Sequence, residues 1–177
     1  MRIVSGKYRG KKLKEFDLTT TKPTLDKVKE SIFNLIQFDV CDAIVLDLFA
    51  GTGALGIEAI SRGAKRVHMV EKNPQAIKLI KANLQGIEGE YFVHNMDYAD
   101  YINQTKERFD IVLLDPPYAT EFGLVAIREL LSHNLLSNNA TIIFETSVQK
   151  DISFDDLPFD VKRKKYGSVL VYKLEKL

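Results

Sequence analysis

The chain has 177 residues, of which 45% are hydrophobic and 28% charged, and its formal net charge is +1. This is an ordinary balance for a globular protein long enough to bury a core. The single cysteine, Cys41, excludes an internal disulfide framework, and we expect it to be a small buried residue. Because the apolar runs are short and the first residues lack a signal-like segment, we expect a cytoplasmic protein without membrane contact.

Positive charge is concentrated at the start of the chain. Residues 1–29 carry nine basic and three acidic side chains, which gives +6, while the remainder carries −5. A basic arm on a mildly acidic body suits binding to RNA or DNA, and lysines that protect an edge strand are an equally good explanation. A second basic run at residues 162–165 has the same two interpretations. Alternation over residues 3–13 predicts a hairpin that turns near Gly10, and helical spacing over residues 26–37 predicts a helix packed on the body.

From residue 43 onward, the pattern predicts strands alternating with helices. Strands are expected at 43–48, 66–71, 90–94, 109–114 and 140–145, helices at 55–62, 73–84 and 122–131, and a terminal hairpin at 161–165 and 168–174 with Gly167 near its turn. Such alternation indicates an α/β fold with a doubly wound, mostly parallel sheet, here of seven strands including the antiparallel hairpin. Ligands of these sheets bind at the carboxyl ends of the strands.

A glycine-rich loop follows the first predicted strand. Gly51, Gly53 and Gly56 form the spacing GxGxxG, which permits a tight turn and close approach of the backbone to a nucleotide. Glu71 ends the next strand, twenty positions after Gly51, where a carboxylate can accept hydrogen bonds from both ribose hydroxyls of an adenosine. These features fit NAD and S-adenosylmethionine equally well.

Two acids favour S-adenosylmethionine. Asp47 precedes the first glycine by four residues and is suited to the ammonium of a methionine moiety, whereas a pyrophosphate gains nothing from that charge. Asp97 follows the third strand and is expected either to accept from the adenine amine or to cap a helix that begins near Tyr98. Phe49 and Lys72 complete the predicted cofactor contacts, although Phe49 is also suited to the core.

A rigid corner follows the fourth predicted strand, with the sequence Asp115-Pro116-Pro117-Tyr118. An exocyclic base amine is a poor nucleophile because its lone pair is delocalised into the ring. The Asp115 carboxylate and the Pro116 carbonyl are suitable acceptors for its two hydrogens, and they would stabilise charge that develops on nitrogen. The prolines fix the corner and Tyr118 offers a ring for stacking on an extruded base. An ordinary strand-ending turn is the alternative.

No metal site is expected, since His68, His94 and His133 are far apart in the sequence and no acid or cysteine cluster joins them.

The glycine loop and the corner together predict methyl transfer to a base amine. Open alternatives are a protein-glutamine methyltransferase, a nicotinamide-dependent oxidoreductase and a non-catalytic RNA-binding module.

Four blocks of sequence carry a resemblance to a known family. They are GKYRGKKL at 6–13, KPTLDKVKESIFN at 22–34, LDLFAGTGALGIEA at 46–59 and DPPY at 115–118. Together they resemble the RsmD-like family of bacterial 16S rRNA (guanine-N2)-methyltransferases. The last two blocks are shared with many amino methyltransferases, so adenine-N6 and cytosine-N4 methylation of DNA or RNA stay open on those blocks alone.

The resemblance implies a class I S-adenosylmethionine-dependent methyltransferase fold with a Rossmann-like sheet. The sequence pattern adds a basic arm and packing helix at 1–37 ahead of a methyltransferase domain at 38–177, and the two are expected to form a single structural unit. The resemblance places Thr24 near the methionine end of the cofactor or the RNA, and Lys22 stands where the family often has arginine, so a bidentate contact is lost there. Arg9, Lys11, Lys12 and Lys22 are the expected RNA-binding residues. The expected partner is 16S rRNA within a small ribosomal subunit or an assembly intermediate, bound by a monomer without metal.

Overall fold

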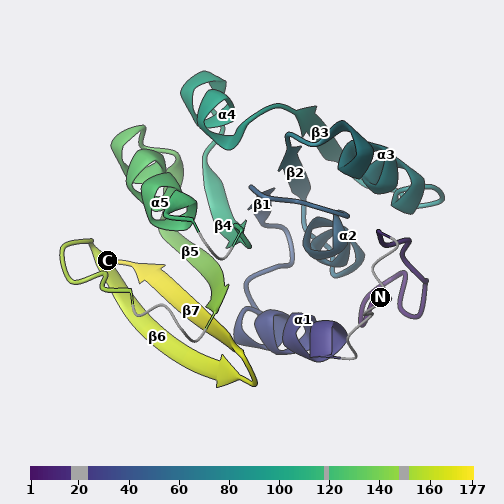
Figure 1. Ribbon diagram of the computed structural model, residues 1–177, viewed down its shortest axis with the longest axis horizontal. Helices are drawn as coiled ribbons and strands as arrows, with labels where there is room; N and C mark the ends of the chain where they lie inside the picture. The colour runs from purple at the N-terminus through teal and green to yellow at the C-terminus, as the bar shows by residue number, and fades with distance from the viewer. Residues whose placement is uncertain (17–23, 118–119, 148–151) are drawn as a thin grey trace.

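The computed structural model describes residues 1–16, 24–117, 120–147 and 152–177 (Figure 1). Its elements are α1 Thr24–Leu35, β1 Ile44–Asp47, α2 Ala54–Ser61, β2 Arg66–Glu71, α3 Pro74–Asn83, β3 Tyr91–Asn95, α4 Tyr98–Gln104, β4 Phe109–Leu114, α5 Phe122–Ser132, β5 Leu136–Ser147, β6 Phe159–Tyr166 and β7 Val169–Lys176. Within these described residues, no helix is long and apolar enough to cross a membrane.

All seven strands form one sheet in the order β3-β2-β1-β4-β5-β7-β6. The first five strands pair in parallel, and β7 pairs antiparallel with both β5 and β6. The strand order reverses between β1 and β4, which is the point where open α/β sheets bind ligands. The predicted mostly parallel sheet with a C-terminal antiparallel hairpin is confirmed.

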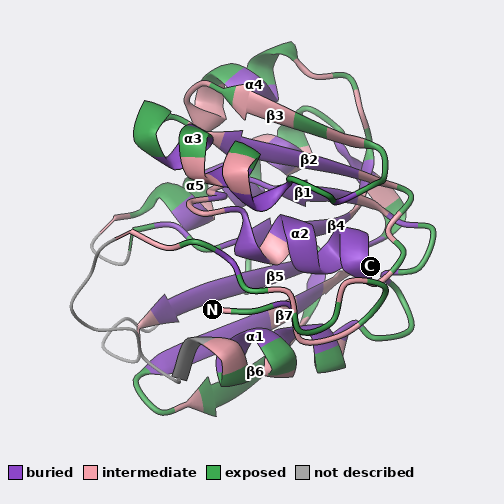
Figure 2. Ribbon diagram, turned by 90° about the vertical axis from the view of Figure 1, so that its right-hand side faces the viewer, coloured by how far each residue is buried: buried purple, intermediate pink, exposed green. Residues whose placement is uncertain are grey.

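Helices cover both faces of the sheet. Figure 1 shows α1, α2 and α3 with the N-terminal segment on one face, and α4 and α5 on the other. Each face has its own apolar cluster: Ile32 and Ile57 belong to the first, and Tyr101 and Ile127 to the second. Figure 2 shows the central strands buried along most of their length, which explains why their sequences read as continuous apolar runs.

Local sequence explains where the helices begin. The side chain of Asn73 accepts a hydrogen bond from the backbone N–H of Gln75 at 2.9 Å, and Pro74 is the first residue of α3, as the sequence predicts. Burial of Val28, Ile32 and Phe33 confirms that α1 packs on the body.

The N-terminal segment lies against the body over its whole described length. The predicted hairpin takes the form of one antiparallel bridge between Arg2 and Lys12, with turns over residues 5–10. Ile3 and Leu13 are buried in the first apolar cluster. Cys41, in contrast, is exposed, so the prediction of a buried cysteine was wrong: it lies in the turns between α1 and β1 rather than in an element that packs on the core.

Candidate active site

The loop after β1 gives the backbone an open curve at the carboxyl edge of the sheet. Gly51 has φ 55° and Gly53 has φ 79°, both in the left-handed region. A Cβ on Gly51 would meet no atom within 4 Å, so the turn leaves free space on that side. Gly53 caps the N-terminus of α2 without any side-chain hydrogen bond. The loop therefore offers backbone and space to a ligand, as the glycine spacing predicts.

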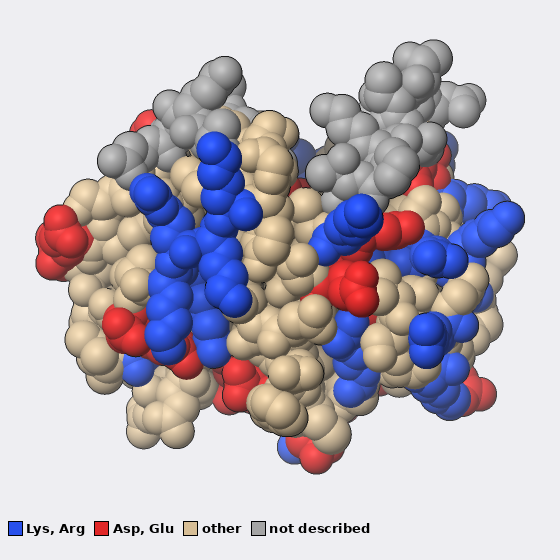
Figure 3. All heavy atoms as spheres, turned by 90° about the horizontal axis from the view of Figure 1, so that it is seen from below, with Lys and Arg blue, Asp and Glu red and all other residues tan. Residues whose placement is uncertain are grey.

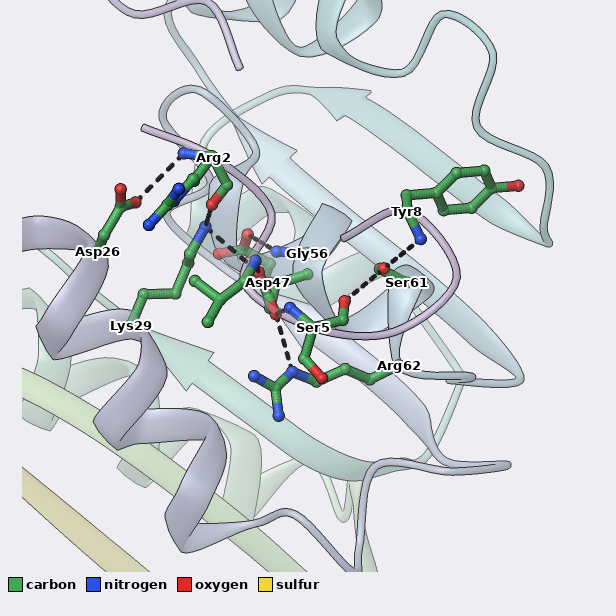
Figure 4. Close-up of polar contacts among 11 residues, drawn as sticks. Arg2, Ser5, Tyr8, Asp26, Lys29, Asp47, Gly56, Ser61 and Arg62 are labelled. Atoms are coloured by element: carbon green, nitrogen blue, oxygen red, sulfur yellow. Dashed lines mark hydrogen bonds and ion pairs between the residues drawn. The ribbon is translucent and has the colours of Figure 1, made fainter. Parts of the chain in front are cut away.

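Asp47 ends β1 and lies directly behind this loop. Its Oδ2 accepts a hydrogen bond from the backbone N–H of Gly56 at 2.9 Å, and the described residues provide no partner for its buried Oδ1 (Figure 4). Burial, opposed by the Gly56 N–H and assisted by the charge of Glu71, raises the pKa of Asp47 from 3.8 to about 7. Only glycine fits at position 56 without displacing its neighbours, because a Cβ there would lie 2.7 Å from Cγ of Met69.

Glu71 ends β2 beside the same loop. Its Oε2 accepts from the backbone N–H of Gly51 at 2.9 Å, and its Oε1 accepts from that of Asn73 at 2.8 Å. Two backbone donors thus hold the carboxylate at one orientation, with lone pairs left for further donors such as ribose hydroxyls.

Residues after β2 and β3 form the next wall. Asp97 caps α4 by accepting from the N–H of Ala99 at 3.1 Å, so the helix-capping alternative is present, and its Oδ2 lies 3.6 Å from Nζ of Lys72. The ring of Phe49 lies 5.1 Å from that of Tyr98, which lies 5.5 Å from that of Phe122. These three rings, tilted by 46° and 43° to their neighbours, give the cavity an aromatic wall with faces on which a purine can pack.

The corner after β4 provides a carboxyl group beside the loop. Asp115 is an exposed residue that lines the cavity, and desolvation by the surrounding protein, followed by the carboxylates of Glu145 and Asp47, raises its pKa well above the usual range. The carbonyl of Pro117 accepts from the N–H and hydroxyl of Thr120, at 3.1 and 2.7 Å. Gly123 allows α5 to pack against the corner, since a Cβ there would lie 3.1 Å from Cγ of Pro116.

One cavity of about 700 Å³ joins these features, a size typical of small-molecule sites. Of the residues predicted from the sequence it is lined by Phe49, Gly51, Glu71, Lys72, Asp97, Asp115, Pro116 and Pro117. Asp47 and Gly53 lie behind the lining. Tyr118 and Lys22 lie outside the described residues, and for Thr24 only its place at the start of α1 is described.

Two charged residues of the cavity were not predicted. Glu145 comes from the end of β5 and adds a third carboxylate to those of Asp47 and Asp115. Lys29, from α1, is 3% exposed, and burial lowers its pKa against the opposing effect of Glu58. An acid in the apolar strand run at 140–145, and a lysine next to Val28 in the apolar stripe of a helix, were the available sequence signals.

Glu58 holds the N-terminal segment against the body. This residue of α2 is fully buried and accepts from the backbone N–H groups of Val4 and Ser5 at 2.9 and 3.0 Å. It also forms ion pairs with Nζ of Lys29 at 3.3 Å and Nε of Arg62 at 2.9 Å, and Lys29 donates to the carbonyl of Arg2 (Figure 4). The same helix therefore carries the glycine loop at its start and the N-terminal segment on its side.

The predicted RNA-binding residues lie on this segment. Arg9 and Lys12 are exposed, whereas Lys11 is half-buried and donates from Nζ to the carbonyl of Gln85. Lys7, which was not among them, is exposed but paired with Glu88 at 2.7 Å. Arg9 and Lys12 are therefore the better candidates for contact with phosphate.

Two histidines that are far apart in sequence meet on neighbouring strands. Nδ1 of His68 lies 3.2 Å from Nε2 of His94 and 2.8 Å from the hydroxyl of Tyr101. Burial lowers the pKa of His68 to about 4. Within the described part of the chain, no group of three or more His, Cys, Asp or Glu residues could hold a metal ion.

Comparisons with known proteins agree with this geometry. Residues 1–174 match the family model described as Conserved hypothetical protein 95. Ribosomal RNA small subunit methyltransferase D of Haemophilus influenzae is 36% identical over 157 residues, which cover 86% of this chain and 81% of that protein. The protein of the same name from Escherichia coli strain K12 is 31% identical over 175 residues, covering 98% and 88%. The solved structure of yhhF from Escherichia coli is similar with a TM-score of 0.87 at 29% identity, covering 99% of this chain and 97% of that one.

Proposed function

The chain belongs to the family described as Conserved hypothetical protein 95, and on that premise we propose that it transfers a methyl group from S-adenosylmethionine to the exocyclic N2 of a guanine in 16S rRNA. Methyltransferase names among its relatives confirm the RsmD-like resemblance and the enzyme class. Because those relatives are named for the RNA of the small ribosomal subunit, they support the same substrate class here.

The observation that carries the proposal is the shared cavity. A glycine loop, a ribose-binding type of carboxylate at Glu71 and the amine-binding type of corner at Asp115 open into one space of about 700 Å³. A methyl donor bound at the first two features can therefore meet a base amine bound at the third. An oxidoreductase would need the glycine loop and Glu71 but has no use for the corner.

The residues present fit S-adenosylmethionine better than a dinucleotide. The cavity is lined by the acids Glu71, Asp97, Asp115 and Glu145 and by two lysines, and the unpartnered Oδ1 of Asp47 lies behind it. This negative lining favours a ligand with sulfonium and ammonium charges and opposes a pyrophosphate. Once bound, the cofactor supplies an electrophilic methyl group on sulfur.

The contacts to the cofactor are assigned by position. Glu71 would accept the ribose hydroxyls, while Asp97 would accept from the adenine amine with the oxygen it does not use to cap α4. Phe49 would pack on the adenine ring, and Lys72 orients Asp97 from 3.6 Å. Asp47 would hold the methionine ammonium from behind the loop of Gly51 and Gly53, and Thr24 is proposed near the same end.

Asp115 and the Pro116 carbonyl would accept the two hydrogens of the guanine amine. These hydrogen bonds draw the nitrogen lone pair out of conjugation with the ring and aim it at the methyl carbon. As the nitrogen–carbon bond forms, the carbon–sulfur bond breaks, and one amine proton then leaves to water. The Asp115 carboxyl stabilises the positive charge that grows on nitrogen, and this charge in turn favours the ionised carboxylate. Tyr118 is proposed to stack on the base.

The substrate form and setting are also proposed by relation to the family. We infer that a cytoplasmic monomer acts on 16S rRNA already arranged in a small subunit or an assembly intermediate, because a chain of 177 residues has little surface with which to recognise distant rRNA elements. The contacts of Arg9, Lys11, Lys12 and Lys22 with phosphate would orient that RNA.

The test is transfer of labelled methyl from S-adenosylmethionine to unmodified small subunits, naked 16S rRNA and duplex DNA in parallel, followed by nucleoside identification. N2-methylguanosine in either rRNA sample is the expected product, and a comparison of the two shows whether assembly is needed. Label in adenine or cytosine would keep the mechanism and overturn the target. Absence of label despite cofactor binding would overturn the proposed activity.

A further inference from the structure

The edge strand β6 carries four consecutive basic residues that play no part in the cavity. Lys162, Arg163, Lys164 and Lys165 are all exposed. β6 is the last strand in the sheet order, and its only pairing among the described strands is with β7. The basic residues therefore lie on an open margin of the sheet.

The strand presents its charge on both sides. Lys164 is opposite Val171, which packs in the apolar cluster under α1, and Lys165 is opposite Leu170, which packs in the cluster under α5. Since paired residues project to the same face, the cations alternate around the strand edge. Figure 3 shows the result as two adjacent columns of Lys and Arg atoms at the left of the molecule.

The register places one end of this basic run at the same edge of the sheet as Asp115, three strand positions away in the order β4-β5-β7-β6. Ser147, the last residue of β5, is opposite Val169 of β7, which in turn is opposite Tyr166 of β6. Because β5 runs parallel to β4, its carboxyl end lies at the same edge as Asp115. The turn between β6 and β7, which begins at Gly167, is thus at the same edge of the sheet as Asp115, and Lys165 and Lys164 precede it by two and three residues.

The charge is compensated at one end of the strand and uncompensated at the other. Lys162 pairs with Glu175 at 2.6 Å and Asp160 at 3.7 Å, away from the turn. The described residues provide no ion-pair partner for Lys164 or Lys165. A charge anywhere along an edge strand protects it, so edge protection does not explain why the uncompensated charge lies at the end that shares a sheet edge with Asp115.

We propose that the tip of the β6–β7 hairpin, through Lys164 and Lys165, binds the phosphates of the RNA strand that delivers its base to Asp115. This rests on the proposed function, because it takes RNA as the substrate. In Figure 1 the β6–β7 hairpin occupies the lower left of the molecule with its turn at the lower middle, and the N-terminal segment lies at the right. Phosphate contacts at both would hold the strand across the cavity, with the target nucleotide between them.

The experiment measures binding of the full chain to a small-subunit rRNA fragment from 50 to 200 mM salt. The test variant is K164Q/K165Q, and the matched control is K65Q/K106Q, which removes two exposed lysines that precede β2 and β4 at the opposite edge of the sheet. Loss of two single-strand phosphate contacts should lower the salt slope by about 1.4. If the free energy of these contacts comes from counterion release, the test variant should bind RNA about 70-fold more weakly than wild type at 50 mM salt and about tenfold more weakly at 200 mM.

Steady-state methylation of the same RNA separates this surface from the catalytic site. The test variant should show a raised KM with kcat retained, and K164R/K165R should restore the KM. Equal salt slopes and KM values for test variant, control and wild type would overturn the surface while leaving the proposed function intact. Loss confined to assembled subunits, with naked RNA bound normally, would overturn it in favour of an acidic protein partner. Hairpin-dependent RNA binding without methylation would support the surface and overturn the proposed function.

Discussion

Asp115 combines an unusual charge environment with a simple task. Removal from bulk water, and then the charges of the Glu145 and Asp47 carboxylates, raise the pKa of its carboxyl group. A ligand that brings positive charge relieves this repulsion. The site is therefore built to gain most when charge develops next to Asp115, which is the condition met in the transition state and not in the resting enzyme.

Asp115→Ala is expected to lower kcat for methyl transfer by about 10²- to 10³-fold, the effect of removing one preorganised electrostatic contact. Calorimetry should show little change in affinity for S-adenosylmethionine, since Glu71 and the loop of Gly51 are untouched. Single-turnover transfer with saturating RNA is the measurement. A variant with weak cofactor binding and surviving turnover would contradict the role given to Asp115.

Asp47 predicts a dependence of stability on pH. Its pKa of about 7 in the folded state exceeds the usual 3.8, so the folded state binds its proton more tightly than the unfolded state. The contribution of Asp47 to the free energy of unfolding should therefore be fully present below pH 4, decrease between pH 4 and 7, and stay constant at higher pH. The whole effect is on the order of 4 kcal/mol.

Asp47→Asn removes this titration while its amide oxygen still accepts from Gly56. Urea denaturation of both proteins between pH 4 and 8 should show wild type losing stability relative to the variant as the pH rises. The variant should also bind S-adenosylmethionine more weakly, because the charge facing the ammonium is gone. A stability difference that stays constant with pH would show that Asp47 does not titrate in this range.

At the scale of elements, the contact between the N-terminal segment and α2 depends on a close backbone approach at Gly6. A Cβ there would lie 1.8 Å from the carbonyl oxygen of Ser61, and φ is +84°. Around it, the N–H of Lys7 donates to that same oxygen at 2.7 Å, and the Ser61 hydroxyl donates to the carbonyl of Ser5 at 2.6 Å. Any side chain at Gly6 must push the segment off the helix.

Gly10 provides the matched control, because its φ is +88° but a Cβ there would meet nothing within 4 Å. Gly10→Ala should lower the free energy of unfolding by about 1–2 kcal/mol, because alanine is strained at this positive φ. Gly6→Ala should lower it further and should speed amide exchange at Ser5, Lys7 and Tyr8. Denaturation and hydrogen exchange measure both. Equal losses in the two variants would mean that the segment is not seated on α2 as described.

Sequence patterns predict those elements whose stabilising contacts are local. β2 and β4 have the predicted bounds because each is a short, mostly apolar run, and α3 has its own cap at Asn73. β5 begins four residues before the predicted strand: Leu136 already pairs with Phe109, while the polar residues 137–139 interrupt the apolar pattern where the register with β4 shifts before Thr141.

The site was predictable where motif spacing encodes it and not where distant segments meet. Glu71 and Asp115 follow strands whose ends the parallel sheet brings together, so their convergence follows from chain order. Glu58 and Lys29 belong to different helices, and His68 and His94 to neighbouring strands, so only the three-dimensional packing reveals these pairs. A buried charge within an apolar helix was the one sequence clue to the first pair.

On the scale of the whole molecule, the basic segment at the start of the chain is part of the folded body as well as the proposed surface for RNA. It buries Ile3 and Leu13, supplies two backbone donors to Glu58, and contributes Met1 and Phe16 to the lining of the cavity. Substrate binding, cofactor binding and stability are therefore expected to share one set of contacts. A division of the chain at residues 37 and 38 into arm and catalytic domain stays a prediction that can be tested.

A chain that lacks residues 1–13 should lose about 3–6 kcal/mol from the burial of Ile3 and Leu13 alone, a large part of the 5–15 kcal/mol typical of a domain. It should also bind S-adenosylmethionine more weakly, because Met1 no longer lines the cavity and Lys29 loses the Arg2 carbonyl. The comparison is R9Q/K12Q, which removes phosphate-binding charge and leaves the packing in place, so RNA affinity alone should fall. Denaturation, calorimetry and RNA titration of wild type, the truncated chain and R9Q/K12Q measure these three effects. A truncated chain with full stability and full cofactor affinity would show that the segment is an appended arm, because its contacts with α2 would then contribute nothing to the fold.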